Sequence, residues 1–291
     1  MNNKKSIPES INLHITQRCN YHCKFCFAKY QNLIKELDCN QFIKIIDELA
    51  NHGCKKVNFA GGEPTLVPFL PELISHSKEQ GLYTSIISNG TGIDQEFMKK
   101  ISEQLNLIGL SIDSQLDIIE KVLGRTLKKT PHYYSHVDNI KNKVNLIREF
   151  GVPIKINSVI TPLNWNEDMT KLITYIKPIR WKVFEIHRLK GINDEFFTEF
   201  GQLEHWQLNI FLQKHKVLNP IFESSNMILD SYCMITPDGR FYQDTNNQHH
   251  YSQSILEIGI YEAFCQIKYQ EKKYLMRKGD YFKDLMDYIS N

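Results

Sequence analysis

The chain has 291 residues, 42% of them hydrophobic and 23% charged, which is the composition of an ordinary globular protein with room for one large core or two smaller ones. With 35 Lys and Arg against 33 Asp and Glu, the formal net charge is +2, which excludes a nucleic-acid or anionic-membrane binder that works through bulk charge. No apolar run approaches the roughly 18 residues of a membrane span, and the polar residues 1–8 lack the apolar segment of a signal peptide, so we expect a cytoplasmic protein.

Short β-rich runs alternate with helix-length amphipathic segments over the first two thirds of the chain. The runs expected to be strands are residues 10–15, 55–60, 82–88, 107–113, 152–160 and 180–187. The segments expected to be helices are residues 40–52, 69–80, 94–104, 137–150 and 167–176, with N-caps at Asp94 and in residues 164–166. This alternation is typical of an α/β fold with a parallel sheet and crossover helices. Residues 115–136 form a long connection, which predicts a functional loop or an extra helix.

The alternation stops after residue 187. Residues 203–215 predict a helix, and Pro237-Asp238-Gly239 predicts the turn of a hairpin between residues 232–235 and 240–242, followed by two further helical segments. We therefore expect six β/α units in residues 1–190 and an α+β extension in residues 191–291, packed together as one compact unit.

Polar residues fall on one face of the expected strands, because side chains along a strand alternate between two faces. They are Asn12 and His14, Lys56 and Asn58, Ser111 and Asp113, Lys155 and Asn157, and Arg180 and Lys182. A packed barrel interior would instead hold Val, Ile and Leu. Two interpretations remain open at this point: a polar lumen that holds a ligand, or the solvent-facing side of an open sheet.

Cys19, Cys23 and Cys26 follow the first expected strand at the spacing C-x3-C-x2-C. Such crowding of three of the seven cysteines indicates a metal or redox site rather than a disulfide framework. Structural zinc needs a fourth ligand, for which His14 or His22 is available, but no second cysteine pair follows. Three thiolates leave one iron of a [4Fe-4S] cluster without a protein ligand, and that iron can bind a substrate.

The cysteine triplet, Phe25 just before its third member and the turn Gly61-Gly62-Glu63-Pro64 after the second strand resemble the radical S-adenosylmethionine (SAM) superfamily. The resemblance implies a partial (β/α)6 barrel, a [4Fe-4S] cluster held by the three cysteines, and SAM bound at the open iron. The cluster would donate the electron that cleaves SAM to methionine and a 5′-deoxyadenosyl radical. In the turn, the glycines let the backbone approach the ligand, and Glu63 can accept from the methionyl ammonium.

Further segments resemble the viperins, a family of antiviral nucleotide dehydratases within that superfamily, from about residue 12 to residue 279. These segments are residues 19–27, 57–64, 87–90, 155–160, 167–169, 180–184, 223–226 and 230–232. The resemblance implies conversion of a nucleoside triphosphate (CTP, UTP or GTP) to its 3′-deoxy-3′,4′-didehydro analogue, a chain-terminating antiviral nucleotide. The adenosyl radical would abstract the ribose 4′ hydrogen, the 3′ hydroxyl would leave as water, and a reduction with proton transfer would follow.

The resemblance also implies roles for individual residues. Those expected to contact SAM are Gly61, Gly62, Glu63, Asn89, Ser111, Arg125, Asn157 and Val183. Those expected to bind the nucleotide are Asn12, Lys56, Lys155, Arg180, Lys182, Glu223 and His249. Lysine and arginine fit this role, because a triphosphate carries about four negative charges and needs charged donors. Glu223 is expected to read the base or the ribose, His249 stands where animal viperins carry a phosphate-side Lys, and Tyr232 is expected to supply hydrogen to the sugar.

The expected partners are the nucleotide and an electron donor, a flavodoxin or ferredoxin, with no nucleic-acid or membrane partner; we expect a monomer. The chain departs from animal viperins at Ala60, where they carry Ser, in lacking their N-terminal amphipathic helix, and in residues 287–291, which lack their Trp. Two alternatives remain open: another radical SAM enzyme that acts on a peptide or small molecule, and a non-catalytic iron–sulfur or zinc module. The sequence does not determine the base of the nucleotide.

Overall fold

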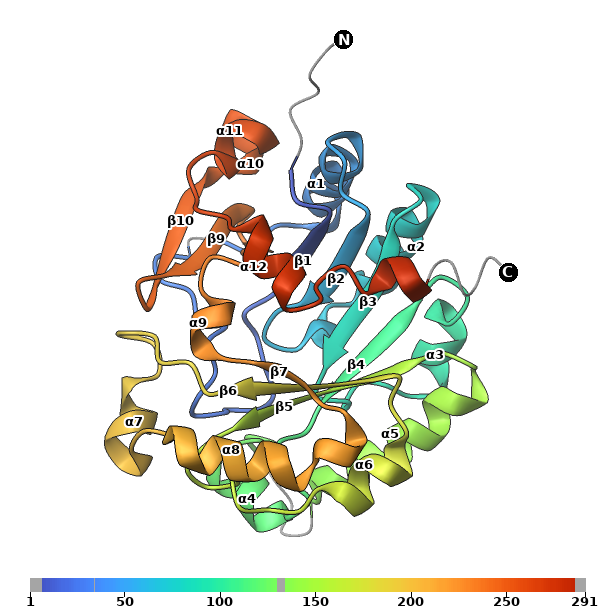
Figure 1. Ribbon diagram of the computed structural model, residues 1–291. Helices are drawn as coiled ribbons and strands as arrows, with labels where there is room; N and C mark the ends of the chain where they lie inside the picture. Colours follow the sequence, from blue (N-terminus) through green and yellow to red (C-terminus); the bar gives the residue numbers. More distant parts are fainter. Residues whose placement is uncertain (1–6, 34, 130–133, 286–291) are drawn as a thin grey trace.

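The strands form one curved sheet in the computed structural model, which describes residues 7–33, 35–129 and 134–285 (Figure 1). Within those residues the sheet has ten strands, in the order β10-β9-β8-β1-β2-β3-β4-β5-β6-β7. The strands from β8 through β1 to β7 are parallel, whereas β9 and β10 are antiparallel to their neighbours. The strands are β1 (Ser10–His14), β2 (Lys56–Ala60), β3 (Tyr83–Ser88), β4 (Leu107–Ser111), β5 (Ile154–Ile160), β6 (Arg180–Glu185), β7 (Ile221–Glu223), β8 (Cys233–Ile235), β9 (Arg240–Thr245) and β10 (Gln248–Ser254).

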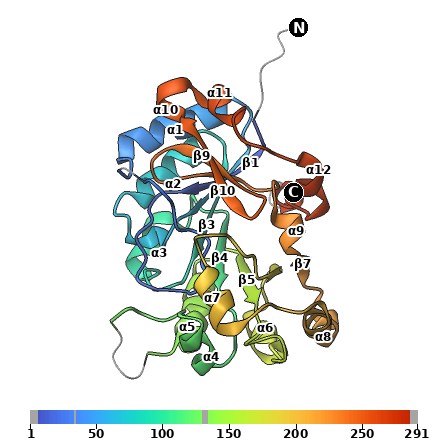
Figure 2. The same cartoon turned by 90° about the vertical axis from the view of Figure 1, so that its left-hand side faces the viewer.

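Helices cover the outer side of this curved sheet (Figure 2). Those that connect the central strands are α1 (Cys39–Asn51), α2 (Leu70–Glu79), α3 (Gln95–Ile101), α4 (Asp117–Val122), α5 (His136–Glu149) and α6 (Thr170–Ile176), with the 3-10 helix η1 (Pro64–Leu66). The later helices are α7 (Asp194–Phe200), α8 (His205–Lys214), η2 (Lys216–Leu218), α9 (Ser225–Ile228), α10 (Ile255–Ile258), α11 (Ile260–Phe264) and α12 (Glu271–Met276). Of these, α9 and α12 lie on the inner side of the curve, in front of the strands in Figure 1. The parallel strands β1 to β6 and the helices that connect them form a partial (β/α)6 barrel, as the sequence predicted.

The apolar face of the central strands forms the core together with the helices. Ile11 of β1 and Phe59 of β2 are fully buried in this cluster. Helix α1 illustrates the packing, because its buried residues recur at the helical period: Phe42, Ile45, Ile46 and Leu49. Its start is fixed by a capping box, in which the Asp38 side chain accepts from the Gln41 N–H at 3.0 Å. The opposite, polar face of the strands is therefore left for the inside of the curve.

The six predicted strands, the hairpin and the extra helix after β4 are confirmed, with shifts of one to three residues at the strand ends. Asp94 caps α3 as predicted, accepting from the Phe97 N–H at 2.8 Å. The cap expected in residues 164–166 is wrong, since α6 begins at Thr170 and Asn164 instead donates to the carbonyl oxygens of Asp113 and Val159. Asn164 thus ties the ends of β4 and β5 together.

The C-terminal extension adds strands to both edges of the barrel sheet. β7 pairs with β6 at one edge, while β8 pairs with β1 at the other and continues into the β9–β10 hairpin. The sequence did not predict β7 or β10. After β10, Gly259 at φ +88° separates two short helices, α10 and α11, and α12 follows them. No helix among the described residues is long and apolar enough to cross a membrane. Residues 1–6 and 287–291, to which the sequence analysis also refers, lie outside the described residues.

Candidate active site

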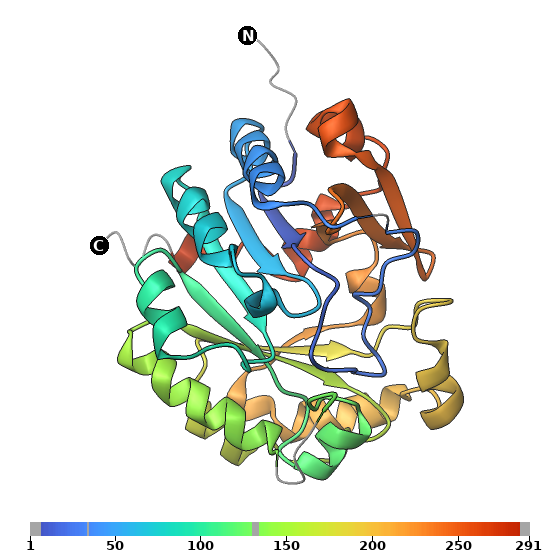
Figure 3. The same cartoon turned by 180° about the vertical axis from the view of Figure 1, so that it is seen from behind.

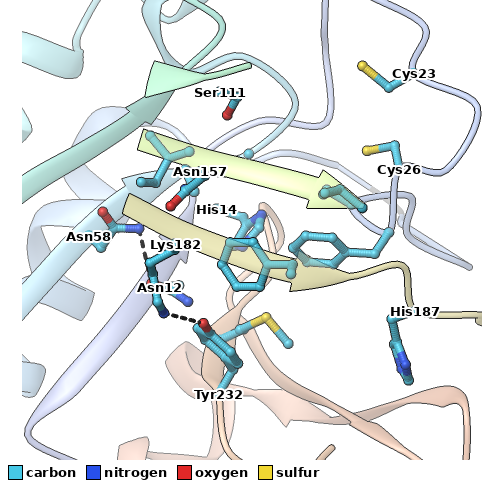
Figure 4. Close-up of a pocket in the computed structure, with 18 of the residues that line it drawn as sticks. Asn12, His14, Cys23, Cys26, Asn58, Ser111, Asn157, Lys182, His187 and Tyr232 are labelled. Carbon is cyan, nitrogen blue, oxygen red and sulfur yellow. Dashed lines mark hydrogen bonds between the residues drawn. The ribbon is translucent and has the colours of Figure 1, made fainter. Parts of the chain in front are cut away.

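A cavity of about 510 Å³ lies on the polar side of the sheet. The strand residues that line it include Asn12, His14, Lys56, Asn58, Ser111, Lys155, Asn157 and Lys182. This confirms the polar lumen among the two interpretations of the strand pattern. Figure 4 shows the cavity between Ser111 and Asn157 on one side and Asn12, Lys182 and Tyr232 on the other, with Cys23 and Cys26 beyond the ends of the strands.

The cysteine loop leaves the end of β1 and crosses toward the segment that follows β4 (Figure 3). Cys19, Cys23 and Cys26 all line the cavity as free thiols. The backbone of the loop is held by that segment, with the His22 N–H donating to Gly124 O at 3.2 Å and the Lys24 N–H to Leu123 O at 2.9 Å. The long connection predicted after β4 therefore supports the cysteine loop.

The thiols suit a cluster better than a single ion. Among the described residues no three His, Cys, Asp or Glu side chains converge as one zinc ion would require. A [4Fe-4S] cube binds each thiolate through a different iron and does not require the three sulfurs to converge on one ion, so Cys19, Cys23 and Cys26 lining one cavity suit it. Burial raises the pKa of the Cys23 thiol, and iron binding supplies the positive charge that its thiolate form needs there.

The two glycines of the Gly-Gly-Glu-Pro turn are required by the backbone of the cysteine loop. A Cβ on Gly61 would lie 2.4 Å from Thr16 O, and one on Gly62 would lie 2.3 Å from Arg18 O. The Gly62 N–H donates to Thr16 O at 2.6 Å, which joins the turn to the start of the loop. The sequence interpretation assigned these glycines to an approach of the backbone to the ligand, but the close contact in the structure is between two loops of the chain.

Glu63 is buried and joins the ends of β2 and β3. Its Oε1 accepts from the hydroxyls of Thr65 and Ser88, both at 2.7 Å, and its Oε2 accepts from the Asn89 N–H at 2.8 Å. The Asn89 side chain in turn donates to Asn20 in the cysteine loop at 2.8 Å. Glu63 and Asn89 line the cavity, and Oε2 has room for one further donor from a ligand.

Polar groups suited to SAM surround the cysteine end of the cavity. Asn157 Oδ1 is buried without a hydrogen-bond partner among the described residues, so it lacks a donor that a bound ligand can supply. Arg125 lines the cavity and is fixed by Asp113, to which its Nε donates at 2.5 Å. Ser111 lies at the end of β4 and also lines the cavity. Val183 is not brought to the site as expected, since its side chain faces the apolar core and the residue does not line the cavity.

Cations gather at the other end of the cavity. Lys56, Lys155 and Lys182 line it as expected, and Arg277, which the sequence analysis missed, joins them from the segment after α12. Tyr281, also missed, lies under this group: Lys56 Nζ is 4.0 Å from the centre of its ring. Neither residue belongs to a motif or a strand pattern, so nothing in the sequence singled them out.

Arg180 belongs to this group by charge but does not line the cavity. Its guanidinium lies 4.3 Å from the ring centre of Tyr281 and donates to the carbonyl oxygen of Lys278 at 2.8 Å. It therefore holds the C-terminal segment against the sheet, and Tyr281 stands between it and the nucleotide position expected from the sequence. Asn12 faces the cavity and accepts from the Asn58 side chain at 3.0 Å.

Tyr232 lines the cavity beside Lys182 and Asn12 (Figure 4). Its hydroxyl receives a hydrogen bond from Lys182 Nζ at 2.9 Å and donates to Glu223 at 2.6 Å. Glu223 is fully buried, forms an ion pair with Lys182 and lies 3.7 Å from Arg277 Nη1. Glu223 does not line the cavity. Its carboxylate interacts with Tyr232, Lys182 and Arg277, and not with the base or ribose as the sequence led us to expect.

His249 lies away from the cations. Its Nε2 donates to the carbonyl oxygen of Phe27 at 2.9 Å, and its Nδ1 lies 2.6 Å from the carboxylate of Asp244. It is not among the residues that line the cavity. The structure places it at the cysteine loop and not at the phosphates, because the β9–β10 hairpin packs beside that loop.

Comparisons with known proteins agree with this geometry. The radical SAM superfamily profile matches residues 13–176. An S-adenosylmethionine-dependent nucleotide dehydratase from Flammeovirga pacifica is 35% identical over 285 residues, which cover 95% of this chain and 96% of that protein. The S-adenosylmethionine-dependent nucleotide dehydratase RSAD2 from Danio rerio is 34% identical over 286 residues, covering 94% of this chain and 78% of that protein.

Solved structures agree in fold. Native anSMEcpe with bound AdoMet superposes with a TM-score of 0.61 at 17% identity, covering 88% of this chain and 80% of that one. Streptococcus suis SuiB bound to S-adenosylmethionine gives 0.62 at 17% identity, covering 81% and 60%. Enzymes of the superfamily use a [4Fe-4S] cluster and SAM, which the thiols and the polar groups described above are suited to hold. The chain belongs to the radical SAM superfamily, in the family of enzymes named S-adenosylmethionine-dependent nucleotide dehydratases.

Proposed function

We propose that this enzyme dehydrates a nucleoside triphosphate to its 3′-deoxy-3′,4′-didehydro analogue. The names of its relatives support a nucleotide substrate. The cations at one end of the cavity support a triphosphate. When bound, the cluster and SAM supply a carbon-centred radical that can abstract a hydrogen atom from the substrate.

The observation that carries this proposal is the group of cations at the end of the cavity away from the cysteines, Lys56, Lys155, Lys182 and Arg277. Burial, followed by repulsion between neighbouring cations, lowers the pKa of Lys56 and Lys155 well below the usual value for lysine. Glu223 is paired with Lys182 and Arg277 and leaves the other two without a carboxylate partner among the described residues. A polyanion at this end offsets the repulsion, and a triphosphate has the charge for it.

The other residues then have the following roles in this proposal. Gly61, Gly62, Glu63, Asn89, Ser111, Arg125 and Asn157, which all line the cavity, hold SAM by side chain or backbone. Asn12 orients the nucleotide beside the cations. The ribose lies between SAM and Tyr232, whose hydroxyl supplies hydrogen to the sugar after the 3′ hydroxyl has left as water. A Tyr hydroxyl that donates to Glu223 and receives from Lys182 is held in one place for such a transfer.

The test is an anaerobic assay of the reconstituted protein with SAM and each of the four NTPs in separate reactions. Dithionite replaces the flavodoxin or ferredoxin that we expect as electron donor. The proposal predicts formation of 5′-deoxyadenosine together with loss of one water from the mass of one or more NTPs, and neither with Cys23→Ala. SAM cleavage without a change in the mass of any NTP would show that the substrate is a different molecule.

A further inference from the structure

Tyr21, which stands between the first two cysteines of the triplet, is hydrogen-bonded to a buried histidine outside the cysteine loop. Its hydroxyl lies 2.9 Å from Nδ1 of His136, the first residue of α5. Nε2 of the same imidazole lies 2.9 Å from the carbonyl oxygen of Ser111 at the end of β4. Tyr21 and Ser111 both line the cavity, so the imidazole connects two of its walls.

The direction of each hydrogen bond follows from the groups involved. A carbonyl oxygen only accepts, so His136 Nε2 carries a hydrogen and donates to Ser111. Burial, and then the charge of Arg125, lower the pKa of His136 to about 3, which leaves its Nδ1 as an acceptor for the Tyr21 hydroxyl. The Tyr134 hydroxyl, which is hydrogen-bonded to that of Tyr21, is then the donor of that pair. The bonds therefore run in one direction, from Tyr134 to Ser111.

The position of His136 is fixed by the structure around it. Ser135 caps the start of α5, because its hydroxyl accepts from the Asp138 N–H at 2.9 Å. The His136 and Tyr21 side chains belong to residues that are only 1% and 2% exposed, and their rings pack edge-on at 5.4 Å between centres. An imidazole held at both nitrogens and at the start of a helix gives Tyr21 a fixed partner.

A second tyrosine, four residues after the triplet, offers a matched comparison. The Tyr30 hydroxyl lies 2.5 Å from Nδ1 of His14, whose Nε2 lies 3.1 Å from the hydroxyl of Tyr242 on β9. This pair joins the end of the cysteine loop to the β9–β10 hairpin. The pair of Tyr21 and His136 ends instead at Ser111, a residue proposed above to hold SAM.

We propose that His136 is a positioning residue for SAM, which sets the place of the cysteine loop relative to the end of β4 through Tyr21 and the Ser111 carbonyl. SAM needs both the open iron of the cluster, which the loop holds, and the polar groups at the strand ends. Without the connection the loop populates other positions, and the affinity for SAM falls with the fraction of chains in the competent one. The proposal rests on the SAM position given under the proposed function but not on the nucleotide, so the two can fail independently.

The test is a double-mutant cycle read out as SAM affinity, by anaerobic calorimetry on the reconstituted, oxidised protein without nucleotide. Tyr21→Phe removes only the hydroxyl, and His136→Gln removes the acceptor at Nδ1 while its amide can still donate to Ser111. We expect roughly 3- to 10-fold weaker SAM binding in each, as for the loss of one neutral hydrogen bond. The double variant should lose no more than either single one, because the same interaction is already gone.

Tyr30→Phe is the control: it removes the matched hydroxyl from the same loop and should bind SAM as the parent does. Iron content is measured for every variant, and thermal melting checks that each is folded at the temperature of the titration. Full iron content with weaker SAM binding in the Tyr21 and His136 variants alone supports the proposal.

Four results would overturn it. Parental SAM affinity in Tyr21→Phe would show that the hydroxyl does not matter, and additive losses in the double variant would show that the two residues act separately. Equal weakening by Tyr30→Phe would mean that any loosening of the loop has this effect. Loss of iron from Tyr21→Phe would mean that the hydroxyl serves cluster loading rather than the position of SAM.

Discussion

The hydroxyl of Tyr232 donates to Oε2 of Glu223 at 2.6 Å, and Glu223 has no exposed surface. Burial raises the pKa of Tyr232 well above its usual value, so the phenol stays protonated. Burial opposes ionisation of Glu223 as well, but the charges of Lys182 and Arg277 prevail and lower its pKa. A neutral phenol thus donates to an ionised carboxylate, and this hydrogen bond holds the hydroxyl of Tyr232 in one place.

We predict that Tyr232→Phe separates SAM cleavage from product formation. The ring and its packing against Arg277, at 3.6 Å from the ring centre, remain, so nucleotide binding changes little. Without the hydroxyl the sugar lacks its hydrogen donor, and product formation falls by roughly 10²-fold or more. The measurement is the ratio of didehydro nucleotide to 5′-deoxyadenosine in each reaction. An unchanged ratio would assign the hydrogen to another donor.

Glu223→Gln should destabilise the ligand-free protein. The substitution leaves Lys182 buried, with 5% of its side chain exposed, and removes its carboxylate partner. Breaking such a pair from one side costs about 3–5 kcal/mol. Urea unfolding under reducing conditions measures the loss, and the double variant Lys182→Met, Glu223→Gln should recover part of it because no uncompensated charge stays behind. A double variant less stable than the single one would mean that the ion pair is not the source of the loss.

Patterns contained in one stretch of sequence predicted the strands, the cysteine motif and the polar face, because each depends only on neighbours along the chain. Lys56, Lys155 and Lys182 were found in this way, since strand alternation fixes the face on which they lie. Arg277 and Tyr281 also line the cavity, but they come from the C-terminal part of the chain. No sequence pattern around them indicates this position.

The misplaced residues share a physical cause. His249 carries the right chemistry for a phosphate, but the register of the β9–β10 hairpin pairs it with Asp244 and turns it toward the cysteine loop. Arg180 lies on the expected strand, yet Tyr281 covers it. For Gly62 the need for a small residue was predicted, but its close contact with Arg18 on another loop was not. Tertiary contacts decide such roles.

Lys155→Met should weaken nucleotide binding and stabilise the ligand-free protein at the same time. Lys155 is buried beside other cations, and their repulsion disappears with its charge. We expect a KM for the nucleotide about 10- to 100-fold higher, the effect of losing a charged hydrogen bond of roughly 1.5–3 kcal/mol. Stability should rise by about 1 kcal/mol or more. Lys99→Met, on the exposed face of α3, is the control and should alter neither the KM nor the urea midpoint.

Nucleotide binding should weaken as the pH rises through about 8. Burial lowers the pKa of Lys182 to about 8, although Glu223 favours its charged form. Below that pH the ammonium is present and attracts the triphosphate; above it the charge is lost, so the KM for the nucleotide increases. The pKa of Lys182 in the folded protein lies below the value of 10.5 for an exposed lysine, so between these two pH values the unfolded chain binds more protons than the folded one. The free energy of unfolding should therefore rise with pH in that window. Lys182→Arg keeps its charge and should flatten the KM profile; a profile that is the same in both proteins would assign the titration to another group.

Gly62→Ala should prevent the protein from holding its cluster. The added Cβ would lie 2.3 Å from Arg18 O and 2.6 Å from Gln17 O, which are backbone atoms that cannot move without displacing the start of the cysteine loop. Cys19 follows Arg18 directly, so the displacement reaches a cluster ligand. We expect a large loss of iron per chain after reconstitution, measured with the absorbance of the cluster. Gly81→Ala is the control: its Cβ would meet nothing within 4 Å, so it bears only the backbone strain of φ +75°, roughly 1 kcal/mol, and should load iron normally. Equal iron content in both variants would mean that the loop tolerates the displacement and that the Gly62 contact does not set the geometry of the cysteines.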